Sequence, residues 1–154
     1  MAMGIVLFTV AIMFFVFNFV GNTIVDSVTP IAAINESTQS LSAFQSIGDV
    51  VNKLDYVVFG LFVGLLLALI ITSWFISGNP IFMFIYFIVV IISTIISTML
   101  ANTWEDITTT AVFGTTINSF PLTNNLMLNL PIYITIAGFI GMIIMFGKPF
   151  FQDE

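Results

Sequence analysis

The sequence contains no cysteine and no histidine, and its two basic residues are Lys53 and Lys148. The lack of cysteine excludes disulfides and thiol chemistry, and the lack of both residue types excludes the metal sites that they build. There is no imidazole for acid–base catalysis. The formal net charge of −6 argues against nucleic acid as a partner, because phosphate contacts need clustered Lys and Arg. We therefore expect no cofactor, no metal and no nucleic acid.

Charge of either sign is scarce, at 6% of the 154 residues, whereas 59% of the residues are hydrophobic. The mean hydropathy is +1.17. A chain of this composition has too few polar residues to cover the surface of a soluble globule. We therefore expect an integral membrane protein, with the lipid bilayer as one of its partners.

Two apolar runs without charge, residues 56–76 and 81–101, are separated by the four residues 77–80, Ser-Gly-Asn-Pro. Each run has the length of roughly 20 residues that an α-helix needs to cross about 30 Å of hydrocarbon. The short connection brings the second helix back antiparallel to the first, with Pro80 in its first turn. The sequence predicts a transmembrane helical hairpin.

Two further apolar runs flank this hairpin. Residues 4–25 are rich in Phe and are interpreted as a retained helix rather than a cleaved signal peptide, because no Lys or Arg precedes them. Residues 126–146 form the last run, and Asn129 and Pro131 predict an irregular first turn. The predicted fold class is all-α, with one membrane domain over residues 1–154 and about four transmembrane helices, so that both termini lie on one side.

The region between the first two runs contains an amphipathic segment at residues 38–55, with apolar residues at three- and four-residue steps. Ser37 and its neighbours offer N-cap chemistry for a helix there. The helix either lies in the membrane interface or continues into 56–76 as one rod. Its polar face lacks the lysines of a membrane-surface binder, so we expect a protein partner or a second copy of the chain. The predicted contact residues are Leu41, Phe44, Ile47 and Val51.

Residues 102–125 are polar and are predicted to form a loop or a short β-prone segment over the bundle. Trp104 is expected to act as an aromatic anchor at a solvated membrane boundary. Glu105 and Asp106 are neighbours in sequence, so they do not face each other on a helix and form no acid–base pair. We predict that these two acids contact the partner.

Small residues within the runs indicate helix–helix packing. Gly60 and Gly64 form a GxxxG pair, for which we favour packing within the chain over homodimerisation, because a hairpin partner is already adjacent. Ser93 and Ser97 belong to a stripe of hydroxyls that either lines a pore or, as we favour, packs with its hydroxyls bonded to the backbone. The predicted packing residues are Gly60, Gly64, Ser93, Ser97, Gly138 and Gly141.

The hairpin also carries a resemblance. It is found in the stretch from Trp74 to Phe82 and in the Ile-, Val-, Ser- and Thr-rich span that follows and ends with residues 101–106. This region, residues 74–106, resembles small multi-span membrane proteins encoded by bacterial and archaeal viruses, including tailless viruses whose capsid surrounds a lipid membrane. The resemblance implies a virion protein that is embedded in the internal vesicle, contacts the capsid through its loop side and has no catalytic residues.

We therefore expect a structural or assembly protein of a virion membrane or a host inner membrane, with other membrane or capsid proteins as partners. A holin-like or channel-forming protein is the alternative, although such proteins commonly carry a basic tail and this tail is acidic. An enzyme would have to use Glu105 and Asp106 with the hydroxyls of residues 108–110. No His or neighbouring Lys in the sequence activates those hydroxyls, so we expect no enzymatic activity.

Overall fold

The computed structural model describes residues 2–31, 34, 36–75 and 80–147, with side chains for all of these except 80–83. Every regular element in these ranges is a helix, which confirms the predicted all-α fold class for the described residues. The elements are α1 (Ala2–Val28), α3 (Thr38–Asn52), α4 (Leu54–Phe75), α5 (Pro80–Thr108), the 3₁₀-helix η1 (Thr116–Ser119), α6 (Pro121–Leu128) and α7 (Leu130–Gly147).

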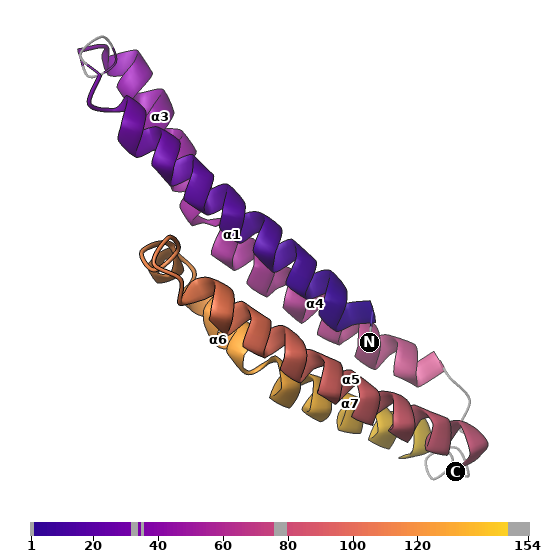
Figure 1. Cartoon of the computed structure of the whole chain (residues 1–154). Coiled ribbons are helices and arrows are strands. Elements are labelled where there is room, and N and C mark those ends of the chain that lie inside the picture. Colours follow the sequence, from indigo (N-terminus) through magenta and orange to yellow (C-terminus); the bar gives the residue numbers. More distant parts are fainter. Residues whose placement is uncertain (1, 32–33, 35, 76–79, 148–154) are drawn as a thin grey trace.

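The helices form one elongated bundle (Figure 1). Its most extensive contact is between α5 and α7, and α4 packs against both α1 and α7. The helix α6 lies between α4 and α5 and leads into α7. In Figure 1, α1 begins and α7 ends toward the end of the bundle where α4 ends and α5 begins. The four long segments therefore alternate in direction, as expected for a chain that crosses a layer four times.

Four segments of the described chain are long and apolar enough to cross a membrane: Ala2–Val28, Thr38–Phe75, Phe84–Thr108 and Leu130–Gly147. They pack against one another over little of their surface, since only 17% of the most apolar window of Thr38–Phe75 is buried inside the chain. A surface this apolar is stable in hydrocarbon and not in water. The length, composition and exposure of these helices indicate a multi-pass membrane protein.

The predicted amphipathic segment is α3, which continues into α4 as one 38-residue helical rod, Thr38–Phe75. Ser37 is its N-cap and accepts a hydrogen bond from the amide of Ser40, as its residue type predicts. A turn at Lys53 interrupts the rod. The Lys53 amide donates to the carbonyls of Val50 and Val51, whereas in a regular α-helix it would donate to the carbonyl four residues earlier. The structure therefore has the segment running on into the next helix, which is one of the two arrangements left open by the sequence.

The prediction of a loop or β-prone segment at residues 102–125 holds for residues 109–115, which form turns, and is wrong for most of the other residues of this segment. The helix α5 does not end at residue 101 but continues to Thr108, and η1 and α6 occupy most of the rest. The described part of this segment has no strand. The helix continues because Trp104, which we expected at a solvated boundary, has a completely buried side chain. Burying an indole in the bundle outweighs the weak helix preference of the polar residues around it.

An aromatic cluster forms the centre of the bundle at the level of Trp104. The ring of Phe15 is fully buried, and its centroid lies 5.3 Å from that of Trp104, 5.4 Å from that of Phe113 and 5.7 Å from that of Phe120. These spacings and the tilted ring planes are those that aromatic pairs prefer. Phe15 thus ties α1 to α5 and to the segment that follows α5.

Replacing Phe15 by Ala should lower the free energy of unfolding by about 3–5 kcal/mol, because it opens a cavity among three other rings. The matched control is Phe17→Ala on the same helix, since the Phe17 side chain is 57% exposed. Thermal unfolding of the protein in detergent, followed by circular dichroism, measures both. Equal destabilisation by the two substitutions would show that the cluster does not hold the bundle together.

Candidate functional site

Polar side chains gather at one end of the apolar bundle in what we call the polar layer, which consists of Asn18, Asn22, Asn52, Asp55, Trp104 and Asn124. Asp55, in the first turn of α4, is 2% exposed. Its Oδ1 accepts a hydrogen bond from the amide of Thr123 at 2.7 Å, and its Oδ2 accepts one from the amide of Leu122 at 3.0 Å. Both carboxylate oxygens are therefore bound to the start of α6.

The start of α6 explains why this acceptor is needed. Pro121 is the first helical residue, and the N-cap Phe120 has no side-chain oxygen to accept from the free amides. Asp55 supplies from another helix the acceptor that a local Ser or Asp would otherwise provide, and its negative charge is favourable at a helix N-terminus. The Thr123 hydroxyl beside it is buried without a hydrogen-bond partner among the described residues.

The amides of the polar layer join α1 to the junction between α3 and α4. Asn18 is fully buried, and its Nδ2 donates to the Val51 carbonyl at 3.0 Å and to Asn52 Oδ1 at 3.3 Å. Asn22 Nδ2 donates to Asn18 Oδ1 at 3.0 Å and also to Asn52 Oδ1. The Asn18 bond satisfies a carbonyl at the turn of Lys53, so the cluster fixes the place where the rod is interrupted.

A further hydrogen bond in the polar layer joins α5 to α6. Trp104 Nε1 donates to Asn124 Oδ1 at 3.0 Å, which satisfies the only polar atom of this buried indole. Asp55, Asn18 and Trp104 thus each hold two segments of the chain together. The two hydrogen bonds to the start of α6 give the Asp55 carboxylate a structural role.

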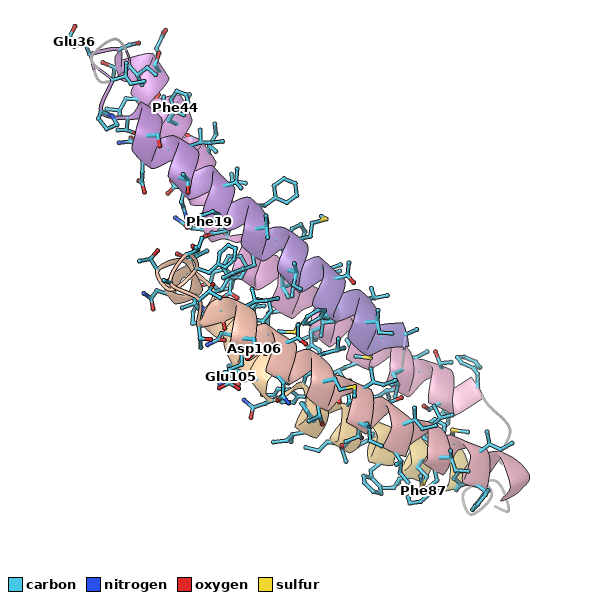
Figure 2. The ribbon with its side chains drawn as sticks, viewed as in Figure 1. Phe19, Glu36, Phe44, Phe87, Glu105 and Asp106 are labelled. Atoms are coloured by element: carbon cyan, nitrogen blue, oxygen red, sulfur yellow. The ribbon has the colours of Figure 1, made fainter. Side chains whose placement is uncertain are left out.

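The arrangement offers no metal centre in the part of the chain that the structure describes, where no group of three or more Asp and Glu side chains converges. Glu105 and Asp106, predicted to contact a partner, are exposed near the end of α5. Figure 2 shows both on the outside of the bundle, near α6. They are therefore available to a partner.

The predicted partner surface on α3 is largely occupied by α1. The two helices pack along each other (Figure 1), and Val51 contacts α1 so closely that a Cβ at Gly21 would lie 2.9 Å from its Cγ2. Leu41 and Phe44 are half-buried as well, whereas Ile47 is 49% exposed. The prediction that Val51 is available to another protein is therefore wrong, because its side chain faces α1 of the same chain.

Two of the predicted packing glycines, Gly138 and Gly141, are buried where α7 meets α5 and α4. A Cβ at Gly138 would lie 2.7 Å from Val90 Cγ1, and one at Gly141 would collide with Tyr86 and Ser73. These glycines let the backbones approach closely. Gly60 and Gly64 differ, since both are exposed and a Cβ on either would meet nothing within 4 Å. The packing within the chain that we favoured for this pair is wrong, because it faces outward.

Part of the hydroxyl stripe of α5 packs against α7. Ser93 and Ser97 are buried, and Ser97 Oγ donates to the Thr94 carbonyl at 2.8 Å. Thr94 also bonds across to α7, with 2.9 Å between its hydroxyl and that of Thr135. Such hydroxyl bonds to backbone and to a neighbouring helix are typical of helix packing in membranes.

The sequence did not single out Asp55, Asn52 or Asn124 as site residues. Asn18 and Asn22 are amides near the end of the first apolar run, a position typical of interfacial or helix-bridging amides. One signal for Asp55 was present: Pro121 is followed by a helical pattern, yet Phe120 before it is no N-cap residue. A helix start without a local acceptor needs one from elsewhere in the fold.

In the described residues, the fold and the polar layer together define a class: an all-helical bundle with four apolar segments of membrane-spanning length, joined at the polar layer by side-chain amides and a buried carboxylate. No protein family, no characterised protein and no solved structure matches this chain. The functional assignment therefore rests on the residues themselves.

Replacing Asp55 by Leu should lower the free energy of unfolding by about 2–4 kcal/mol, because two amides at the start of α6 lose their acceptor. Exposed Asp106→Leu is the control, and it should cost little. Hydrogen exchange gives the specific readout: the amides of Leu122 and Thr123 should lose protection in the first variant only. Unchanged exchange at these two amides would contradict the role of Asp55.

Gly138→Ala should destabilise the bundle by about 1–3 kcal/mol, since its Cβ would overlap Val90 and overpack the contact of α5 with α7. Gly64→Ala is the control, because a Cβ at this position of α4 meets no other atom within 4 Å. It should be neutral or stabilise the protein by up to about 1 kcal/mol, since Ala has the higher helix propensity. Adding Val90→Ala to Gly138→Ala should restore stability. Thermal unfolding measures all three variants, and a double variant no better than Gly138→Ala would contradict the contact.

Proposed function

We propose that this protein is a structural or assembly protein of a membrane, and specifically a component of the membrane of a virion, that contacts capsid protein through an arm outside the bilayer. The arm consists of residues 18–28 of α1 together with α3. The single observation that carries the proposal is that this helix pair, which starts at the polar layer, extends past the end of α5 and the start of α6 (Figure 1).

The dimensions support an arm outside the hydrocarbon. The 22 residues of α4 have a length of about 33 Å at 1.5 Å per residue, close to the hydrocarbon thickness of a bilayer. Beyond the polar layer, the 15 residues of α3 add about 22 Å. Exposed Asp26 and Asp49 lie on the arm, as expected for a segment in water.

The surface of the arm supports a protein partner. Large apolar side chains are exposed on both of its helices, with Val20 at 44% and Ile24 at 48% on α1 and Ile47 at 49% and Val50 at 64% on α3. Exposed apolar groups in a polar surround mark protein contacts. The resemblance of residues 74–106 to small viral membrane proteins supports capsid protein as that partner.

Replacing Ile47 and Val50 together by Asp should reduce the capsid protein recovered with this chain from density-purified particles by at least about tenfold, because two charges would be buried at the contact. The matched control is Gln45 and Ser46 replaced by Asp, which adds the same charge to exposed positions of the same helix. Both proteins should stay in the membrane after an alkaline wash. Equal recovery of capsid protein with both variants contradicts the proposal.

Expression in bacteria separates this proposal from a holin-like or channel function. The buried hydroxyls of α5, bonded within the bundle, support a protein that leaves the membrane potential intact. A voltage-sensitive dye should report a steady potential after induction. An abrupt collapse of the potential would overturn the structural proposal in favour of a channel.

A further inference from the structure

An apolar groove of about 410 Å³ opens on the outer surface of the bundle between α4, α6 and α7. Phe59, Phe62 and Leu66 of α4 line one side of it, and Leu122, Asn125 and Tyr133 line the other. The groove starts at the polar layer, since Leu122 is bound to Asp55, and runs away from it along α4. It therefore lies within the part of the bundle that matches the hydrocarbon.

The walls of the groove are mostly aromatic and aliphatic, which suits a hydrocarbon chain. The rings of Phe62 and Tyr133 meet edge to face with centroids 5.5 Å apart, which fixes the floor. Phe62 is 5% exposed, and Phe59 stands at the rim. Aromatic and aliphatic walls of this kind bind apolar ligands, and a few polar groups set the orientation.

The side-chain amide of Asn125 is held by hydrogen bonds at the part of the groove nearer the polar layer. Asn125 Oδ1 accepts from Tyr133 Oη at 3.4 Å and from Asn129 Nδ2 at 3.3 Å. These bonds show which terminal atom of the Asn125 amide is the oxygen. The other terminal atom, Nδ2, is a donor, and the Asn125 side chain is exposed. None of the described residues accepts a hydrogen bond from this Nδ2.

The order of these groups along the bundle matches that of a glycerolipid. Asn125 comes about one turn, or about 6 Å, after Pro121 at the polar layer. Leu66 comes 11 residues after Asp55 along α4, a rise of about 16 Å. A lipid whose headgroup lies at the polar layer would place an ester carbonyl near the amide and its acyl chain against the rings below.

We propose that this groove binds one glycerophospholipid, with an acyl chain against Phe62 and Leu66 and an ester carbonyl that accepts a hydrogen bond from Asn125 Nδ2. The inference rests on the membrane location in the proposed function and adds to it a bound lipid at a defined site. The occupant is a lipid rather than a protein helix, because the groove is open to the side on which the apolar helices meet the bilayer and its polar group is a single donor.

The test uses the full-length protein reconstituted in vesicles of dioleoylphosphatidylcholine, extracted in mild detergent and examined by native mass spectrometry. The wild-type protein should carry one phospholipid. Leu66→Trp, which fills the groove, should lower the lipid-bound fraction about tenfold. Leu67→Trp is the matched control, because Leu67 is the next residue, is 54% exposed and lies outside the groove, so it should keep the lipid.

The amide is tested separately by Asn125→Leu and by the matched dialkyl ether lipid, which lacks the ester carbonyl. The wild type should retain the ester lipid several-fold better than the ether lipid, and Asn125→Leu should abolish that preference. This measurement keeps the site testable if Leu66→Trp does not fold. Equal retention of both lipids by the wild type would overturn the assigned hydrogen bond.

Two failures are distinguishable. If an alkaline carbonate wash releases the protein from the vesicles, the membrane location and with it the proposed function fail. If the protein stays in the pellet but the wild type carries no lipid, or the Leu66→Trp and Leu67→Trp variants carry equal amounts, the lipid site fails while the proposed function stands.

Discussion

The hydrogen bonds from the start of α6 to Asp55 are the constraint on which the arrangement of the bundle depends. They join residues that are 67 and 68 positions apart in the chain. By holding the first turn of α6 against α4, they set where α7 begins, and they bring Asn124 within reach of Trp104. They also position Leu122, which lines the groove beside α6.

Below the polar layer the chain relies on close packing rather than on strong polar interactions. Apolar side chains are as stable against lipid hydrocarbon as against a neighbouring helix. The association of the helices must therefore come from close backbone approach and from hydroxyl hydrogen bonds. Gly138 and Gly141 provide the first, and the Thr94–Thr135 pair provides the second. This explains how helices with so much exposed apolar surface still form one defined bundle.

Hydropathy was sufficient to predict the fold class and the four long apolar segments, because the requirement to cross hydrocarbon acts on each helix alone. The end of α5 was not predictable in this way. It depends on the burial of Trp104 against Phe15, a contact between distant parts of the chain. The site shows the same limit: the type and place of Asn18 were visible in the sequence, but its partners at Val51 and Asn52 were not. The outward direction of Gly60 and Gly64 was likewise set by how α4 rotates to bury Val58 and Phe62.

The two tryptophans lie on different helices, Trp74 near the end of α4 and Trp104 near the end of α5, and they differ in environment. Trp104 is fully buried at the polar layer, level with the start of α4, whereas Trp74 is 56% exposed near the end of α4. Indole emission depends on the surrounding medium, so the chain carries two natural optical probes, one for internal packing and one for the medium around the bundle. A change in the emission of one tryptophan alone would therefore identify the end at which the bundle has opened.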